Sequence, residues 1–201
     1  MDSLKILTLS CIQGITELLP VSSSAHIILF GEVLNIQANT ALLTMLHFGS
    51  TMAIMFFLKD IIFDNLLSKN NRVFLVKVLI ATIPAAIVGV LFEDYIENIL
   101  RGVLPISISL VLWGIVMIIL DRSKRIRNKD IKNIPFWKIF LIGSSQIFAL
   151  IPGTSRSGIT SITGILLGIE KFTAFKLGLL MGIPILLGSS FWIFVKSLVN
   201  N

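Results

Sequence analysis

Charged side chains are scarce in this sequence, in which they make up 14% of 201 residues while 55% are apolar. Soluble domains carry roughly 25% charged residues. A chain of this length also has too little interior to hide so much apolar surface from water. The mean hydropathy of +0.92 points the same way. The composition therefore excludes an ordinary soluble domain and predicts a protein embedded in lipid.

Cysteine is nearly absent, since Cys11 is the single example. One cysteine can form neither an intramolecular disulfide nor a CxxC or thiolate zinc site. The sequence also lacks the G-x-x-x-x-G-K pattern of a Walker loop and the Cys and His pattern of a zinc hydrolase. A bound metal ion would therefore have to be held by oxygen or nitrogen atoms.

Basic residues outnumber acidic ones by 17 to 11, but their distribution does not favour a nucleic-acid partner. Six basic residues fall within residues 121–133, which is typical of a cytoplasmic loop. The acidic connection that contains Glu93, Asp94 and Glu97 is then expected outside. The first apolar run leads into a polar cluster and not into a cleavage site, so we do not expect a removed signal peptide.

Four apolar stretches are close to the length of about 20 residues that a spanning helix needs. They cover residues 39–58, 73–92, 103–120 and 172–199. Two further apolar regions are each interrupted in the middle by proline and a run of hydroxyl residues. These regions are 4–34, interrupted at 20–24, and 136–169, interrupted at 152–158. Non-helical backbone is tolerated in lipid only where it is buried in protein or lines a watery cavity, so each interruption predicts a cavity.

The two interruptions resemble each other, since residues 13–25 read QGITELLPVSSSA and residues 146–158 read QIFALIPGTSRSG. Paired interrupted segments indicate a repeat, commonly inverted, with a binding site where the interruptions meet. A chance likeness between two Pro-Ser loops is the alternative. We predict an all-α integral membrane protein, a polytopic helix bundle with two broken or re-entrant helical hairpins related by an inverted repeat. It forms one membrane domain over 1–201, with halves of roughly 1–92 and 103–201.

The first interruption carries acid, hydroxyl and imidazole groups. Gln13 and Glu17 are four residues apart and share one helix face, and an acid inside an apolar segment is costly and usually functional. Glu17 is expected to be a metal ligand or a proton acceptor. His26 follows Ser22-Ser23-Ser24, and these groups are suited to nucleophilic or acid and base catalysis. His47, inside an uninterrupted span, is expected to be only a hydrogen-bonded residue.

The second interruption carries a fixed positive charge, Arg156, between Ser155 and Ser157. Gly153 and Gly158 allow close backbone approach. Helix N-terminal N–H groups, hydroxyls and a guanidinium together bind phosphate. Snorkelling of Arg156 to the interface is the alternative. Joining the two interruptions puts an acid and an imidazole opposite an anion site, which predicts a lipid phosphate as ligand and phosphoryl transfer as the chemistry.

These residues resemble the undecaprenyl-diphosphate phosphatase family, the bacitracin-resistance phosphatases. Residues 13–26 are similar to its (E/Q)xxxE motif with the following PVSS-x-x-H, and residues 152–158 to its PGxSRSG motif. The likeness covers nearly the whole chain. It implies a multi-pass plasma-membrane enzyme that hydrolyses a polyprenyl diphosphate to the monophosphate on the extracytoplasmic side. This reaction recycles the lipid carrier for cell-wall polymers, including peptidoglycan.

The resemblance also implies roles for individual residues. Gln13 and Glu17 would face the diphosphate and a divalent cation such as Mg²⁺ or Ca²⁺, and Ser23 and His26 would be the candidate nucleophile, base or proton donor. The phosphates would be bound by Arg156 with further binding groups: Ser22, Gly153, Ser155 and Thr160.

The sequence departs from the family pattern in three places. Gln13 stands where Glu is frequent, which weakens cation binding, and Ala25 stands where Gly is common. Family members usually continue for two more spanning helices after the segment that here ends at Val199. Without such helices one side of the bundle would be open, and a homodimer could cover it.

Two other functions compete with the enzyme. A translocase for polyprenyl phosphate would use the same broken-helix plan without hydrolysis. A structural or partner-binding membrane subunit would leave Glu17, His26 and Arg156 unexplained.

Overall fold

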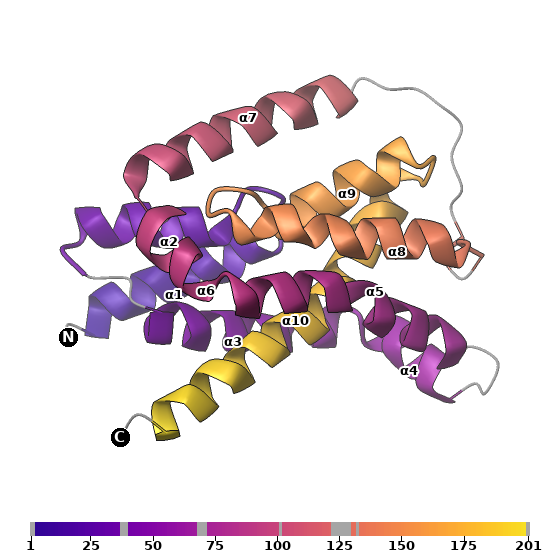
Figure 1. Ribbon diagram of the computed structural model, residues 1–201, viewed down its shortest axis with the longest axis horizontal. Coiled ribbons are helices and arrows are strands. Elements are labelled where there is room, and N and C mark those ends of the chain that lie inside the picture. The colour runs from indigo at the N-terminus through magenta and orange to yellow at the C-terminus, as the bar shows by residue number, and fades with distance from the viewer. Residues whose placement is uncertain are drawn as a thin grey trace.

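The computed structural model describes residues 3–36, 40–67, 72–100, 102–121, 130–131 and 133–199, and every secondary-structure element within these ranges is helical (Figure 1). The elements in chain order are α1 (Ser3–Glu17), α2 (Ser23–Val33), α3 (Thr40–Phe57), α4 (Lys59–Leu67), α5 (Arg72–Leu91), α6 (Glu93–Tyr95), the π-helical turn η1 (Ile96–Leu100), α7 (Val103–Asp121), α8 (Phe136–Ser144), the 3₁₀ segment η2 (Ser145–Leu150), α9 (Arg156–Leu166) and α10 (Lys171–Val199). The expectation of an all-α protein is confirmed for the described residues.

The four stretches expected to be uninterrupted are helices α3, α5, α7 and α10, with ends within one or two residues of the predicted ones. Within the described residues, α5 and the Lys171–Lys196 part of α10 are long and apolar enough to cross a membrane. Shorter apolar helices cover 42–57, 103–119 and 136–150. The connection after α3, where no helix was expected from the sequence, contains helix α4. Most of the basic segment 121–133, namely 122–129 and 132, lies outside the described residues.

Both interrupted regions fold as two helices joined by a short non-helical segment. The first hairpin is α1 followed by α2, and the second is α8 with η2 followed by α9 (Figure 1). The predicted interruptions at 20–24 and 152–158 fall where the helices break, although α2 already begins at Ser23 and α9 at Arg156.

The two hairpins end in the same way. After α2, Asn35 has a φ of 55° and the N–H of Ile36 donates to the carbonyl of Gly31 at 2.8 Å. After α9, Gly168 has a φ of 83° and the N–H of Ile169 donates to the carbonyl of Gly164 at 2.9 Å. A left-handed residue followed by a bond of this kind closes a Schellman motif, which satisfies the last helical carbonyls.

A lysine from the first helix of each hairpin reaches the end of the second helix. Lys5 of α1 donates to the carbonyl of Leu34 at 2.9 Å, and Lys138 of α8 donates to the carbonyl of Leu167 at 2.6 Å. Each pair is separated by 29 residues in the sequence. A cation at a helix C-terminus is favourable because of the helix dipole. In each hairpin the lysine therefore joins the two helix ends that lie opposite the connecting loop.

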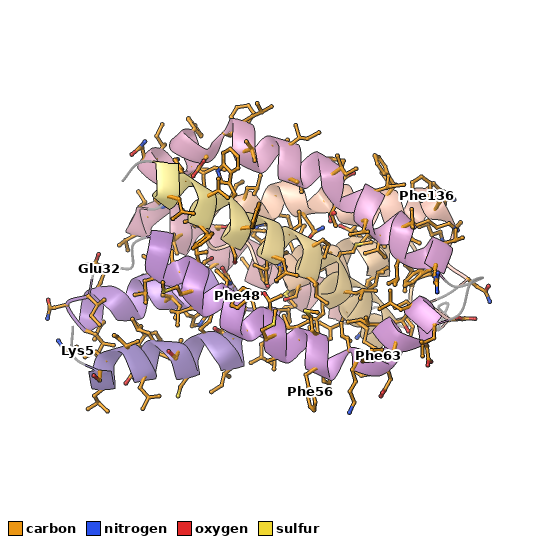
Figure 2. The ribbon with its side chains drawn as sticks, turned by 90° about the horizontal axis from the view of Figure 1, so that it is seen from below. Lys5, Glu32, Phe48, Phe56, Phe63 and Phe136 are labelled. Atoms are coloured by element: carbon orange, nitrogen blue, oxygen red, sulfur yellow. The ribbon has the colours of Figure 1, made fainter. Side chains whose placement is uncertain are left out.

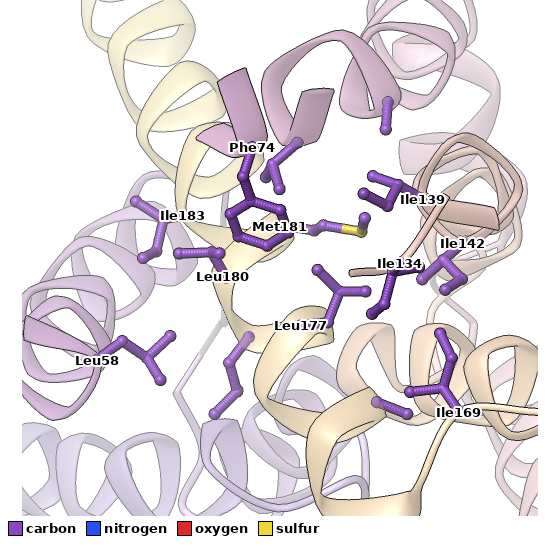
Figure 3. Packing of buried hydrophobic residues seen from close by; sticks show 14 of the residues in the cluster. Leu58, Phe74, Ile134, Ile139, Ile142, Ile169, Leu177, Leu180, Met181 and Ile183 are labelled. Atoms are coloured by element: carbon purple, nitrogen blue, oxygen red, sulfur yellow. The ribbon is translucent and has the colours of Figure 1, made fainter. Parts of the chain in front are cut away.

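The main apolar core lies where α5, α8 and α10 meet (Figure 3). Its fully buried members include Ile139 and Ile142 of α8 and Leu177 and Met181 of α10. A smaller cluster, centred on Leu9, joins α1, α2 and α3. Burying a large aliphatic side chain contributes about 1.5 to 3 kcal/mol. The second hairpin is therefore fixed to the body by the larger core and the first by the smaller one.

The outer surface is rich in large apolar side chains. Phe56 is 72% exposed and Phe63 is 59% exposed, and Figure 2 shows both pointing away from the bundle. Soluble monomers rarely expose contiguous apolar patches of more than a few hundred Å². A surface of this kind, on a chain whose described residues include two helices long enough to cross a bilayer, is that of a membrane protein.

Candidate active site

The tips of the two hairpins meet in the middle of the molecule. The hydroxyl of Ser157 donates to the carbonyl of Leu19 at 3.3 Å, and a Cβ at Gly158 would lie 3.5 Å from the carbonyl oxygen of Pro20. Arg156 forms an ion pair with Glu17 across the same junction. The expected convergence of the two interruptions is confirmed.

Glu17, the last residue of α1, is the centre of the polar cluster and is 5% exposed. Its Oε1 accepts from Nη2 of Arg156. Its Oε2 accepts from the hydroxyl of Ser23 at 2.5 Å and from Nε2 of Gln13 at 3.0 Å. Charge-assisted hydrogen bonds of this kind are roughly twice as strong as neutral ones. The buried carboxylate is therefore held in one orientation with a hydroxyl directly against it.

The non-helical turn between α1 and α2 directs the hydroxyl of Ser23 toward the carboxylate of Glu17. Ser22, just before α2, has a φ of 61°, a left-handed conformation that is uncommon for a residue other than glycine. Ser23 is then the first residue of α2, six residues after Glu17. Strained backbone of this kind tends to occur at functional sites. The turn brings the hydroxyl of α2 back onto the end of α1.

Arg156 is the first residue of α9, and one of the two terminal nitrogens of its guanidinium has no hydrogen-bond partner among the described residues. Nη2 is taken by Glu17, whereas Nη1 is buried and has no hydrogen-bond partner within the described part of the chain. The side chain of Arg156 is 13% exposed. A buried donor without a partner is costly unless a ligand satisfies it. Nη1 is therefore available to an anionic oxygen.

The loop before α9 is fixed by its own hydroxyls and by α7. The side chain of Ser155 accepts from the N–H of Gly158 at 3.1 Å as an N-cap, and Thr154 shares a hydrogen bond of 2.9 Å with Ser109 of α7. Gly153 has a φ of 95°, and a Cβ there would lie 2.6 Å from the carbonyl oxygen of Ile106. Only glycine fits both conditions.

A cavity of about 280 Å³ opens onto these groups. Its polar wall comes from both hairpin tips and includes Glu17, Ser22, Ser23, Ser155 and Arg156. Its apolar wall comes from several helices: Ile28 of α2, Leu43 of α3, Leu150 of η2, and Ile185, Leu186 and Ile193 of α10. The cavity is therefore lined both by charged and hydroxyl groups and by apolar side chains.

Four of the sequence-predicted site residues lie behind or beside this wall. Gln13 is 1% exposed and contacts the cavity wall through Glu17 and His47. Gly153 shapes the loop through its backbone. Thr160 is fully buried and donates to the carbonyl of Arg156 at 2.8 Å. His26 donates from Nδ1 to the carbonyl of Ser22 at 2.8 Å, which leaves its Nε2 as the possible base. Their proposed roles stay predictions.

His47 of α3 lies in the cluster, which the sequence did not indicate. Its Nδ1 lies 3.1 Å from Oε2 of Glu17 and 2.9 Å from Nε2 of Gln13. Nε2 of Gln13 also donates to Glu17 and to Ser50, at 3.0 and 3.2 Å. A carboxylate oxygen only accepts, so the contact of 3.1 Å is a hydrogen bond from His47 to Glu17 when Nδ1 carries the proton. The one sequence signal for this histidine is that two polar residues, Ser50 and Thr51, follow it by about one helical turn on the same face. The hydroxyls of both donate to the carbonyl of His47.

Fold and site together define a helical membrane protein in which two hairpin tips enclose a buried carboxylate, a hydroxyl and a half-paired guanidinium. The family model described as bacitracin resistance protein BacA matches residues 6–201. The chain belongs to this family.

Several curated relatives carry the name undecaprenyl-diphosphatase. Undecaprenyl-diphosphatase 1 of Clostridioides difficile is 40% identical over 201 residues, which cover 94% of this chain and 73% of that protein. The Methanococcus maripaludis protein is 35% identical over 188 residues, 91% of this chain and 75% of its own length. The Enterococcus faecalis protein is 35% identical over 210 residues, 98% of this chain and 76% of its own length.

Proposed function

We propose that this protein hydrolyses undecaprenyl or a related polyprenyl diphosphate to the monophosphate and inorganic phosphate. The observation that carries the proposal is the hydrogen bond of 2.5 Å from the Ser23 hydroxyl to Oε2 of Glu17, while Oε1 of the same carboxylate is paired with Arg156. A hydroxyl against an oriented base is the arrangement of an activated nucleophile. The names of the relatives agree with this chemistry.

The first step is attack by Oγ of Ser23 on the terminal phosphorus of the diphosphate. The proton of Ser23 passes to Oε2 of Glu17, and the bond from that phosphorus to the bridging oxygen breaks, so the polyprenyl monophosphate leaves with the bridging oxygen. Nη1 of Arg156 receives a phosphate oxygen and balances the charge that develops. Water then attacks the phosphoserine and the bond from phosphorus to Oγ breaks. Glu17 returns its proton to Oγ of Ser23, and inorganic phosphate leaves with both hydrogens of the water.

The two kinds of lining residue match the two parts of such a lipid. The diphosphate would bind at Glu17 and Arg156, and the first prenyl units would contact the apolar lining. That lining includes Leu186 and Ile193 of α10 and Leu43 of α3. Ligand sites are typically apolar with a few placed polar groups. The remainder of the prenyl tail would extend into the surrounding bilayer.

A divalent cation, Mg²⁺ or Ca²⁺, would be held by Gln13 and Glu17. The amide oxygen Oε1 of Gln13 is buried and has no partner among the described residues, and Glu17 supplies a carboxylate. Mg²⁺ is commonly bound by one or two carboxylates together with substrate phosphates, so two protein ligands are compatible with it. When bound, the cation would neutralise negative charge on the phosphate oxygens.

Chelation tests the cation. With the protein in detergent micelles, EDTA should abolish phosphate release from farnesyl diphosphate, and added Mg²⁺ or Ca²⁺ should restore it. Gln13→Glu should raise the apparent affinity for the cation, because a carboxylate replaces a neutral ligand. Full activity in EDTA would show that the charge of Arg156 suffices without a metal ion.

The two hairpins are, in this proposal, inverted copies of one re-entrant unit in a multi-pass plasma-membrane protein. The matching helix ends, the two lysines placed 29 residues before the carbonyls that they bind, and the similar loop sequences support it. The site opens to the extracytoplasmic side, and two copies of the chain associate as a homodimer. Hydrolysis there returns the carrier lipid for synthesis of cell-wall polymers.

Phosphate release separates the enzyme from a translocase. Purified protein is incubated with farnesyl diphosphate, and inorganic phosphate is measured for the wild type, Ser23→Ala and a Ser10→Ala control on the far part of α1. We expect release by the wild type and the control, and a loss of at least 100-fold for Ser23→Ala. Transport of polyprenyl phosphate without phosphate release would make the protein a translocase. Release that survives Ser23→Ala would make water the direct nucleophile.

A further inference from the structure

One glycine of α10 lies directly behind the guanidinium of Arg156. A Cβ built at Gly182 would lie 2.0 Å from Nη1, 2.5 Å from Cζ and 2.9 Å from Nη2. Contacts this short are not compatible with any side chain at position 182 while the guanidinium keeps its place. The guanidinium therefore rests against the bare backbone of α10.

The packing against Gly182 fixes where the two terminal nitrogens of the guanidinium, Nη1 and Nη2, lie. With α10 behind it, the group presents Nη2 to Glu17 and keeps Nη1 buried, without a hydrogen-bond partner among the described residues. The backbone at Gly182 is itself buried. Since Leu186 and Ser189 line the cavity, α10 both supports the guanidinium and forms part of the cavity wall.

A second glycine one turn earlier has a different neighbour. A Cβ at Gly178 would lie 2.3 Å from Oγ1 and 3.2 Å from Cβ of Thr160. Thr160 is short, fully buried and bound to its own helix, so a side chain at 178 would push α9 away from α10. At Gly182, by contrast, the clash is with the tip of a long side chain that can move without unfolding the helix pair.

We infer that Gly182 is a positioning residue for the phosphate site: the missing side chain lets the Arg156 guanidinium lie flat on α10 with one edge on Glu17 and the other free for a diphosphate oxygen. The inference rests on the proposed function for the identity of that anion. A side chain at 182 displaces the guanidinium tip and leaves the fold intact. Gly182 thus contributes to substrate binding and turnover without touching the substrate.

The experiment compares Gly182→Ala with Gly188→Ala, both in α10, with Arg156 present or replaced by Ala. A Cβ at Gly188 meets no atom within 4 Å, so this variant controls for the change in helix propensity. Three quantities are measured in detergent: phosphate release from farnesyl diphosphate, affinity for its methylene-bridged diphosphonate analogue, and the melting temperature. The analogue is not hydrolysed and so reports binding alone.

We expect Gly182→Ala to lower kcat/KM and analogue affinity by roughly tenfold or more, while a cooperative melting transition shows that the variant is folded. Gly188→Ala should match the wild type. In the Arg156→Ala background, Gly182→Ala should have no further effect, because the group it displaces is gone. Wild-type kinetics and affinity for Gly182→Ala, or an equal loss in both backgrounds, would overturn the inference.

Two further outcomes remain decisive. If Gly182→Ala does not fold but the double variant with Arg156→Ala does, the guanidinium is the clashing group and the inference stands. If Arg156→Ala folds but the double variant does not, the inference is wrong. If the wild type binds the analogue but releases no phosphate, the proposed function fails, while the affinities of the variants still decide the role of Gly182.

Discussion

At the scale of single residues, the site depends on one buried carboxylate that has four polar neighbours. Burying a charge costs several kcal/mol unless it is paired and hydrogen-bonded. Glu17 meets both conditions through Arg156, Ser23, Gln13 and His47. Removing one partner of a buried ion pair typically costs about 3 to 5 kcal/mol, because the other charge remains buried. Substitutions in this cluster therefore affect both folding and turnover, and conservative variants are the more informative ones.

Arg156→Lys keeps the positive charge but replaces the forked guanidinium, with its two terminal nitrogens, by a single ammonium group. An ammonium cannot bind Glu17 and a phosphate oxygen through two separate edges as a guanidinium does. We expect kcat/KM for farnesyl diphosphate to fall by roughly 100-fold, mostly because the variant stabilises the transition state less well. Steady-state phosphate release at several substrate concentrations measures it. An unchanged rate would argue against phosphate binding by Arg156.

His47→Ala removes a donor to Glu17 that no other described contact replaces. We expect roughly a tenfold loss of kcat, because the carboxylate that takes the proton of Ser23 loses one of its orienting hydrogen bonds. His47→Asn places an amide near the position of Nδ1 and should recover most of the activity. Equal activity of His47→Ala and the wild type would show that the contact of 3.1 Å has no role in turnover.

At the scale of the elements, each hairpin is a pair of short helices whose break serves the site. Helix α2 and helix α9 have 11 residues each, too few to be stable alone in water. Their ends are satisfied by Schellman motifs and lysines, and their starts lie at the junction where Ser157 bonds to Leu19. The loops are therefore held from both sides, which keeps Ser23 and Arg156 in fixed positions.

Gly153→Ala tests how far the second loop depends on its backbone. The φ of 95° and the distance of 2.6 Å from a Cβ to the carbonyl oxygen of Ile106 leave no room for the substitution. We expect the melting temperature to fall by about 4 °C or more and phosphate release to be lost. Gly14→Ala in α1, where a Cβ meets nothing within 4 Å, is the control and should be neutral or slightly stabilising. Equal stability of both variants would contradict the strained loop.

At the scale of the whole molecule, this protein has an apolar outer surface around a buried polar centre, whereas a soluble enzyme has a polar surface around an apolar core. Large apolar residues such as Phe56 face outward, while Gln13 and Glu17 are among the most buried groups (Figure 2). Lipid outside and a polar cavity inside account for both facts. The charge distribution then determines which loops lie on the cytoplasmic side.

Accessibility of single cysteines tests this orientation. In a Cys11→Ser background, Lys124→Cys lies in the basic segment and Asn98→Cys lies in the acidic connection after α5. A membrane-impermeant maleimide applied to intact cells should label position 98, and should label position 124 only after the membrane is opened. The opposite pattern would place the site on the cytoplasmic side and exclude the proposed extracytoplasmic hydrolysis.

Local sequence signals were enough to predict the helices, the two breaks and the presence of Glu17 and Arg156 at one site. Hydropathy acts over about 20 residues, and proline, glycine and serine act on their immediate neighbours, so each of these features can be read from a short window. The likeness of the two loops added that they should meet. Helix α4 was missed because it lies in a short, mixed segment between two apolar spans.

The remaining features of the site depend on contacts between distant parts of the chain. His47 is 34 residues from Gln13, and Arg156 is 139 residues from Glu17. No local pattern places His47 beside the carboxylate or Gly182 behind a guanidinium. Such features arise from the close packing of helices, where a missing Cβ or a rotated ring is decided by what lies opposite. The sequence alone determined which groups are available, and only the tertiary structure decided which of them touch.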